Sequence, residues 1–440
     1  YEIPKRDWSS DVCSSDLKED ARRKAAAISA RNKKKANKAV SVDATVDERV
    51  AAARIRKEIL EKASFGGDRS AAGRYAAFVR WQRARSAGNG PFGRPKTREG
   101  RRLFDALNPT HTGSSLNTHL DYDAAAQELY AKGLNIDSVE AAEIVMKHLS
   151  PERRQMWKDS ILDAQRGVPR NKGGSTVYVK GGGGASGKST TDQKAMAGLP
   201  TGGIPTTEED VVRAESKGQT PPAKQAVLVN SDDWKLKSAD FKALTQRALK
   251  DADDEIRRSG VTDPEKQEDI RQDHLKKAQA AAFVHEESSF VSKMILMASI
   301  LGQRDVVFDG TMDNGVEKRM GELRVMRDFG AKEIHGIFFS ADTNEAVKRS
   351  EKRQRDPQSD SYGRIVPESA LRTAHQKVSA NFPRFVQEKV FDSVAAFDTN
   401  TRPPTLMFRQ SNPTAEPEIL DAEKYDKLLS KANEGGKRHG

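Results

Sequence analysis

The sequence has 440 residues, enough for two to three domains; 36% of them are hydrophobic, 32% charged and 6% aromatic. This polar composition predicts that part of the chain is a solvated arm or linker, and no apolar run approaches the about 18 residues of a membrane span. The formal net charge is +11, and the N-terminus has no apolar secretory core. We therefore expect a cytoplasmic protein without a membrane partner, and a polyanionic partner if the basic residues cluster.

Residues 1–17 contain a segment that we set apart from the fold. Translated back into codons, Asp7–Leu17 (DWSSDVCSSDL) resembles one reading frame of a common sequencing adaptor, and a disordered polar tail is the alternative interpretation. The segment contains Cys13, the single cysteine of the chain. A disulfide framework and a Cys-ligated zinc site are therefore excluded.

The basic residues cluster after this segment. Residues 18–110 carry 24 basic and 10 acidic side chains, a net charge of +14, whereas the last 330 residues sum to −1. Over residues 18–70, the Ala-, Lys- and Arg-rich composition predicts a basic arm that is helical or disordered. Such a density of cations suits nucleic-acid binding through phosphates, but a solvated tail has the same composition, and both interpretations stay open.

A small helical unit is predicted over residues 71–169. Helical patterns recur along it, at Asp123–Lys132, Val139–Leu149 and Pro151–Gln165. Ser150 is a suitable N-cap for the last of them. Three aromatic residues at a spacing of three favour a buried stripe over a base-stacking surface: Tyr75, Phe78 and Trp81. This unit has no recognisable catalytic motif.

A phosphate-binding loop is predicted where the sequence reads GGGGASGKST, after a short β-rich run at Val177–Val179. Its spacing satisfies G-x-x-x-x-G-K-[ST]. Glycines let the backbone N–H groups wrap around phosphate, and the following helix N-terminus adds partial positive charge. Lys188 would bridge the β- and γ-phosphates, and Ser189 would ligate Mg²⁺. The expected nucleotide-binding residues are Gly182, Gly183, Gly184, Ala185, Ser186, Gly187, Lys188, Ser189 and Thr190.

The next chemical signal follows a second strand. After a polar stretch at Gly198–Lys224, which we expect to be a mobile insertion, Ala226–Val229 has the composition of a buried strand and leads to Asp232 and Asp233. Open α/β sheets place their sites at this edge, so a carboxylate there could take the proton of a substrate hydroxyl. A turn in which the carboxylate caps the next helix is the alternative.

A third strand ends in another carboxylate. A helical pattern at Val284–Leu301 leads into DVVFDGT, in which Asp309 closes the strand and is placed to hold magnesium. We group Asp309, Thr311 and, further along the chain, Arg349 with the candidate substrate-binding residues. The preceding helix opens with HEESS, where Glu287 is either part of an ordinary acidic first turn or a substrate contact.

A lid that carries arginines is predicted downstream of a core strand at Glu333–Ala341. Arg349 and Arg353 lie four apart on a helix, and Arg364 lies beyond a mobile-looking loop. Phosphoryl transfer needs cations that close over the γ-phosphate when substrate is present, whereas a solvated basic face is the alternative. We expect a strand near Ser393–Asp398, an end of the domain near residue 410, and a tail over 411–440 with a short helix.

In this order the motifs resemble the zeta-toxin family of P-loop kinases, over about residues 175–400. The resemblance rests on GGGGASGKST, NSDDWK, HEESS ahead of VVFDGT, an R-x-x-x-R helix and GRIVP. It implies an α/β fold, a P-loop kinase-type parallel sheet flanked by helices, at about 170–410.

The resemblance also implies roles for the candidate residues. Asp232 matches the base that acts on a sugar hydroxyl, and Asp233 is one residue off. Arg364 matches a lid arginine, with Arg353 or Arg349 as the second. Asp309 stands at the position of the metal-side carboxylate, where the family often has Glu, and Glu287 would be a second acid that contacts substrate.

The activity implied is transfer of a phosphoryl group from ATP or GTP, with Mg²⁺, to a small hydroxyl substrate such as UDP-N-acetylglucosamine, by an enzyme held inactive by a small antitoxin. The long N-terminal extension departs from compact toxins and suits a phage or mobile-element protein. Two alternatives stay open. One is a nucleoside or polynucleotide hydroxyl kinase whose arm holds nucleic acid; the other is a nucleic-acid-associated structural protein with a regulatory nucleotide site.

Overall fold

The computed structural model describes residues 95–107, 115–134, 139–188, 196, 198–359 and 361–433. The predicted basic arm and the aromatic residues Tyr75, Phe78 and Trp81 lie outside the described residues. Every described residue belongs to one compact unit, Gly66–Gly440. The predicted boundary near residue 170 falls inside that unit and stays a prediction.

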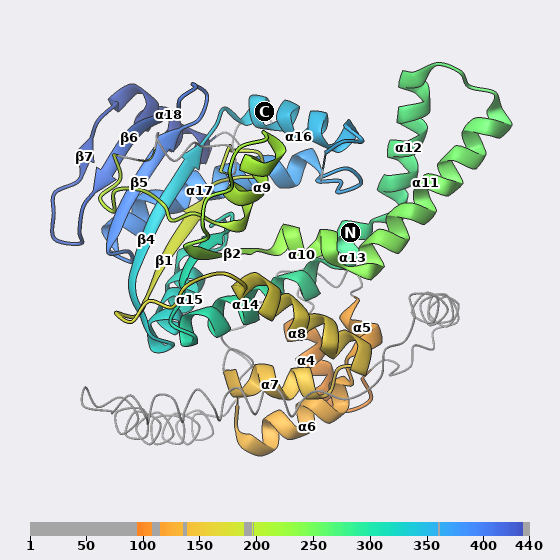
Figure 1. The fold of residues 1–440 in the computed structure, drawn as a ribbon, viewed down its shortest axis with the longest axis horizontal. Coiled ribbons are helices and arrows are strands. Elements are labelled where there is room, and N and C mark those ends of the chain that lie inside the picture. Colours follow the sequence, from red (N-terminus) through yellow and green to blue (C-terminus); the bar gives the residue numbers. More distant parts are fainter. Residues whose placement is uncertain are drawn as a thin grey trace. The chain divides into compact units, whose positions relative to one another are not determined.

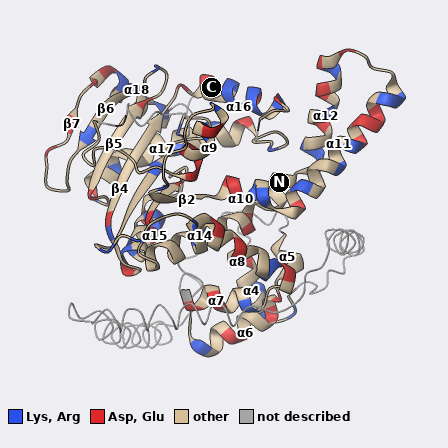
Figure 2. Cartoon of the chain, viewed as in Figure 1, with Lys and Arg blue, Asp and Glu red and all other residues tan. Residues whose placement is uncertain are grey.

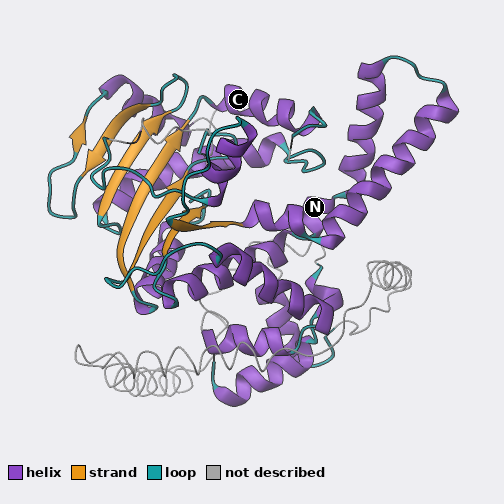
Figure 3. Cartoon of the chain, in the orientation of Figure 1, coloured by secondary structure: helices purple, strands orange, loops and turns teal. Residues whose placement is uncertain are grey.

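A seven-stranded sheet forms the centre of the described region, in the order β2-β3-β1-β4-β5-β6-β7 (Figures 1 and 3). The strands are β1 (Ser175–Gly181), β2 (Ala226–Asn230), β3 (Asp305–Asp309), β4 (Ala331–Ser340), β5 (Ser393–Asp398), β6 (Thr405–Gln410) and β7 (Glu418–Ile419). From β2 to β5 neighbouring strands are parallel, and β6 and β7 continue the sheet antiparallel. The predicted α/β fold with a largely parallel sheet is therefore confirmed, and so are the strands predicted near residues 177, 226, 305 and 393.

Both faces of the parallel part of the sheet, from β2 to β5, are covered, which explains why these strands contain continuous apolar runs. On one face, Val177 and Ile334 share a core with α14 (His285–Leu301), α15 (Val316–Asp328) and α17 (Glu368–Gln387). On the other face, Leu199 and Ile204 are 6% exposed each and pack on strand residues such as Val307. These two apolar side chains hold the first part of the Pro- and Gly-rich segment Gly198–Lys224 against the sheet, and the mobility expected of that segment stays a prediction.

Five helices precede the sheet in the described residues: α4 (Arg98–Leu107), α5 (Leu116–His119), α6 (Tyr122–Lys132), α7 (Val139–Lys147) and α8 (Pro151–Gln165). Three of them, α6, α7 and α8, agree with the three predicted helices to within two residues at each end. The side chain of Ser150 accepts a hydrogen bond from Arg153 N, as expected of an N-cap. The last helix, α8, packs against α14 and β2, so the helical unit lies directly on the sheet domain (Figure 1).

The remaining helices are α9 (Glu208–Ser216), α10 (Ser231–Lys237), α11 (Ala239–Ser259), α12 (Pro264–Ala278), α13 (Ala280–Phe283), α16 (Thr343–Arg355) and α18 (Ala422–Ser430). Helices α11 and α12 pack on each other as an antiparallel pair, which no sequence motif had indicated (Figure 1). Within the described ranges, none of the helices has the length and apolarity to cross a lipid bilayer.

Candidate active site

The predicted phosphate-binding loop leaves β1 at the carboxyl edge of the sheet, between β3 and β4. Gly182 has φ +146°, and a Cβ on it would lie 2.6 Å from the carbonyl oxygen of Phe339, so only glycine fits. Its N–H donates to the carbonyl of Thr311 at 3.1 Å. Lys188 Nζ donates to the carbonyls of Gly182 and Gly183, at 2.9 and 3.3 Å. The loop thus folds back over the strand ends with its lysine held at the centre.

The middle of the loop has the backbone of a phosphate cradle. Ala185 and Gly187 both have positive φ, +56° and +86°, which turns successive peptide N–H groups. Ser186 is 1% exposed, and its hydroxyl has no hydrogen-bond partner within the described part of the chain. A bound phosphate would satisfy such a group. Gly184 lies in the same turn, whereas Ser189 and Thr190 lie outside the described residues.

Carboxylates gather beside this loop because parallel strands end at a common edge. The register pairs Lys180 of β1 with Asp309 of β3, and Asp309 with Asn230 of β2. Asp309 Oδ1 lies 3.7 Å from Lys188 Nζ, as expected of a carboxylate that follows the third strand. Thr311 lies against the loop through its backbone, and its hydroxyl donates to Asp313.

Asp232 lies in the first turn of α10 and pairs with two cations. Its backbone N–H donates to the side chain of Asn230, which caps the helix. One of its carboxylate oxygens accepts from Lys235 Nζ at 2.9 Å, and the other lies 3.2 Å from Arg364 Nη1. Burial raises the pKa of Asp232, but Lys235 and Arg364, with Lys188 further away, lower it more. The carboxyl group is therefore ionised well below its usual range.

Asp233, the next residue, has the opposite electrostatic surroundings. Burial and the nearby charges of Glu209 and Asp309 raise its pKa to about 7. Glu209 belongs to α9, and burial raises its pKa too. Two adjacent carboxyl groups thus differ in protonation at neutral pH, which sequence alone could not show because α9 supplies one of the charges.

Of the three predicted lid arginines, the structure brings Arg364 to the other site residues through its ion pair with Asp232. Arg349 pairs instead with Glu345 of its own helix at 3.2 Å. Arg353 is half-buried one turn further along α16, whose basic residues stand out in blue in Figure 2.

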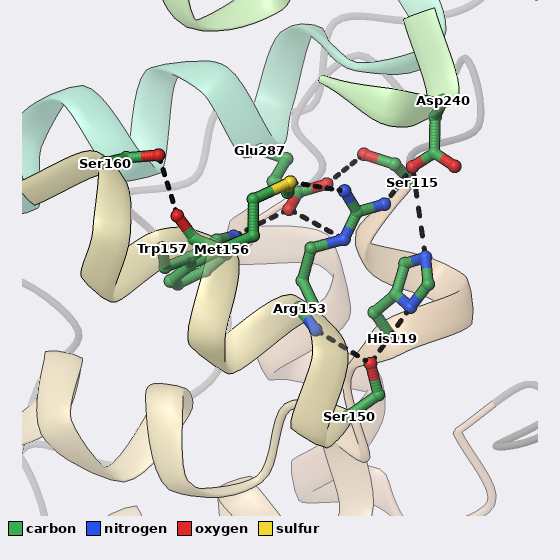
Figure 4. A network of polar contacts seen from close by, with 9 residues as sticks. All are labelled: Ser115, His119, Ser150, Arg153, Met156, Trp157, Ser160, Asp240 and Glu287. Carbon is green, nitrogen blue, oxygen red and sulfur yellow. Dashed lines mark hydrogen bonds and ion pairs between the residues drawn. The ribbon is translucent and has the colours of Figure 1, made fainter. Parts of the chain in front are cut away.

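Glu287 lies elsewhere, inside the junction between the helical unit and the sheet domain (Figure 4). It is 0% exposed and accepts hydrogen bonds from Trp157 Nε1, at 2.7 Å, and from the hydroxyl of Ser115. Arg153 Nε lies 3.2 Å from the same carboxylate, and the Arg153 guanidinium also pairs with Asp240 at the start of α11. The structure therefore gives Glu287 a structural set of partners in place of the predicted substrate contact.

One residue against the loop was missed in the sequence. His375 of α17 has its Nε2 2.9 Å from the carbonyl of Gly184, and a Cβ on Gly183 would lie 2.2 Å from its ring. Burial lowers the pKa of His375 to about 4, so the neutral ring donates through Nε2 to the carbonyl. No local signal in LRTAHQK could have revealed this contact, because it joins residues 191 apart.

Solved structures give distant likenesses only. The complex of AvrRxo1-ORF1 and AvrRxo1-ORF2 with sulphate ions is 15% identical, with 67% of this chain and 78% of that chain covered and a TM-score of 0.42. The same complex with ATP is 16% identical over 67% and 78%, with a TM-score of 0.41. The PezAT toxin-antitoxin system of Streptococcus pneumoniae is 10% identical over 64% and 95%, with a TM-score of 0.35.

Sequence comparison gives one informative match. No curated protein matches the chain. Residues 264–406, from α12 to β6, match the family model described as Zeta toxin. This range includes Asp309 and the lid segment but begins after the phosphate-binding loop. The predicted resemblance to the zeta-toxin family is therefore confirmed, over about a third of the chain.

Proposed function

We propose that residues 170–410 form a kinase that transfers the γ-phosphoryl group of ATP or GTP to a hydroxyl group of a small acceptor. The proposal rests on the convergence of Lys188, Asp232 and Arg364 at one edge of the sheet. Arg364 lies 3.2 Å from Asp232, and Lys188 is close enough to lower the pKa of that carboxyl group. The loop motif and the family match support the same reaction class.

In the proposed reaction the acceptor hydroxyl donates a hydrogen bond to a carboxylate oxygen of Asp232. The hydroxyl oxygen attacks the γ-phosphorus, a new O–P bond forms, and the bond between the γ-phosphorus and the β–γ bridging oxygen breaks. The proton passes to Asp232, and the bridging oxygen leaves with the nucleoside diphosphate. Lys188 and Arg364 stabilise the charge on the transferred group.

Arg364 has two uses in this scheme. Without substrate it occupies one oxygen of Asp232 while Lys235 occupies the other. When nucleotide is bound, the guanidinium turns to the γ-phosphate, which frees one oxygen of Asp232 for the acceptor hydroxyl. The same movement removes a cation that lowers the pKa of Asp232, so the carboxylate becomes a stronger base only when there is a phosphate to transfer.

Magnesium bound with the nucleotide would neutralise charge on the β- and γ-phosphates. Asp309 fits this ion, because its hard carboxylate oxygen lies at the strand end beside Lys188. Mg²⁺ usually takes one or two protein carboxylates together with substrate phosphates. Ser189, the other expected ligand, lies outside the described residues.

We further propose a nucleotide sugar, such as UDP-N-acetylglucosamine, as the acceptor and a small antitoxin-like protein as inhibitor. Both are supported by the zeta-toxin match alone. The deciding experiment supplies the purified protein with ATP and one acceptor at a time: UDP-N-acetylglucosamine, a nucleoside or a DNA oligonucleotide. We expect a phosphorylated nucleotide sugar by mass spectrometry, and no product with the Lys188→Ala variant. A protein that binds ATP but phosphorylates none of the three would contradict the proposal, and phosphorylated DNA would favour the polynucleotide kinase.

A further inference from the structure

The antiparallel pair α11–α12, which we call the hairpin, is joined directly to the helix that carries Asp232. A single residue, Ser238, separates α10 from α11. It is the C-cap of the first helix and the N-cap of the second, and it is fully buried. Within the hairpin, Ala248 and Ala252 of α11 and Leu275 of α12 are buried. Acidic and basic residues are interspersed over the rest of both helices (Figure 2). The hairpin therefore follows the helix of Asp232 directly, and its two helices pack on each other through a few small or apolar side chains.

One face of α12 holds the segment that leads to Arg364. Gln272 is 4% exposed, and its side-chain amide donates to the backbone carbonyl of Gln354 at 3.0 Å, near the end of α16. One turn earlier, Asp269 accepts from Arg355 at 2.7 Å. These residues lie three apart on α12, so they share a face. The last turn of α16 is therefore fixed to the hairpin by a buried hydrogen bond and an exposed ion pair.

The two residues before Arg364 are held by the same hairpin. The hydroxyl of Tyr362 donates to Glu268 of α12 at 3.3 Å, and burial, followed by the charge of Glu268, raises the pKa of Tyr362 to about 12, so it stays a donor. Gly363 has φ +79° and packs between the two helices. A Cβ on it would lie 2.9 Å from Thr245 Cγ2 and 3.4 Å from Leu275 Cδ2.

We propose that the hairpin is a positioning element that sets the place of Arg364 relative to Asp232. It continues into α10, which carries Asp232, and it holds Tyr362 and Gly363, which immediately precede Arg364 in a turn closed by Arg364 N and the carbonyl of Ser361 at 3.0 Å. Both partners of the 3.2 Å ion pair are therefore connected to the same hairpin, Asp232 along the chain and Arg364 through Tyr362 and Gly363. The inference rests on the proposed function for the catalytic role of Arg364. The contacts by which the hairpin holds Tyr362 and Gly363 do not depend on that function.

The test is a methyl group at Gly363. Gly363→Ala places a Cβ against Thr245, and we expect kcat to fall by about 10²-fold, the cost of misplacing a reacting group by about 1 Å, while the Kd of ATP changes less than about threefold. Gly260→Ala is the matched control: Gly260 ends α11 with φ +66°, and nothing lies within 4 Å of its added Cβ. Its kcat should be unchanged. Adding Thr245→Ser to Gly363→Ala removes the methyl group that clashes and should restore most of the loss.

A second readout separates this inference from the proposed function. The amides of Tyr362 and Arg364 are hydrogen-bonded within the turn, and their hydrogen exchange should speed up in Gly363→Ala but not in Gly260→Ala. Faster exchange with unchanged kcat would refute the role given to Arg364 in transfer, whereas a wild-type protein that transfers no phosphoryl group would refute the proposed function and leave the exchange rates as the test of the hairpin. Unchanged exchange in a folded Gly363→Ala protein would refute the positioning role of the hairpin. If that variant does not fold, Tyr362→Phe, which removes only the bond to Glu268, should show the same faster exchange; a wild-type rate there would overturn the inference.

Discussion

The dependence of kcat/KM on pH should reveal which of the two adjacent carboxyl groups of α10 accepts the proton. Lys235 and Arg364 outweigh burial and hold the pKa of Asp232 well below its usual range, whereas burial, Glu209 and Asp309 raise that of Asp233 to about 7. If Asp232 is the base, it is ionised throughout, and kcat/KM stays flat between about pH 5.5 and 8. If Asp233 is the base, kcat/KM falls about tenfold per pH unit below 7.

The two amide variants give the size of the effect. Asp232→Asn removes the proton acceptor and should slow transfer by roughly 10²–10⁴-fold, which corresponds to about 3–5 kcal/mol of transition-state stabilisation. Asp233→Asn is the matched control on the neighbouring residue. Because the amide resembles the protonated acid that already makes up about half of this group at pH 7, its kcat/KM should stay within about threefold of wild type.

Initial rates with saturating magnesium nucleotide and varied acceptor, for wild type and both variants, would measure this. A wild-type inflection near pH 7 that vanishes in Asp233→Asn would refute the assignment of Asp232. So would a full loss of transfer in Asp233→Asn with an active Asp232→Asn.

Four further outcomes are expected. Lys188→Ala should abolish transfer in a protein with unchanged circular dichroism, and normal turnover in a folded variant would remove the kinase. Arg153→Met should lower the free energy of unfolding, measured in urea, by about 3–5 kcal/mol, because it leaves the buried Glu287 without its cation. Arg166→Met is the control and should change the free energy of unfolding very little, because the side chain of Arg166 is 78% exposed and that of Arg153 only 4%. Asp233→Asn should raise Tm at pH 8 but not at pH 3. The pKa of Asp233 is raised in the folded protein, so the unfolded chain loses this proton at lower pH than the folded one. Ionisation of Asp233 therefore destabilises the folded wild type increasingly as pH rises from about 4 to 7, and by a constant amount above 7. Residues 18–110, expressed alone, should bind DNA with an affinity that falls steeply with salt, and a failure to bind at low salt would make them a solvated tail.

The sheet and its edge residues were predictable from local patterns. Strands buried on both faces are continuous apolar runs, and a carboxylate directly after such a run must lie at the sheet edge, as Asp309 and Asp232 do. The helix N-cap at Ser150 is equally local. The sequence signal was therefore sufficient wherever a few neighbouring residues determine the structure.

Partners brought together over long distances were not predictable. The HEESS segment looks the same whether Glu287 faces substrate or a buried arginine, and the choice depends on Arg153, in a helix more than a hundred residues earlier. The raised pKa of Asp233 depends on Glu209, from a segment whose Pro and Gly content suggested mobility. The hairpin has an amphipathic pattern but no motif, so its contact with Tyr362 could not be inferred from sequence.

The position of β1 in the middle of the sheet has a consequence for the order of events during synthesis. Thr176 of β1 donates to Asp305 of β3, 129 residues later, and on its other side β1 pairs with β4, up to Phe338. At about 5–20 residues per second, the phosphate-binding loop leaves the ribosome roughly 8 to 30 seconds before the last of the strands that hold it in place. ATP should therefore bind a nascent chain only after β4 has emerged, and Arg364 joins later still. If synthesis ends before that point, the shortened chain has the sequence of the phosphate-binding loop but lacks the neighbouring strands that hold the loop in place.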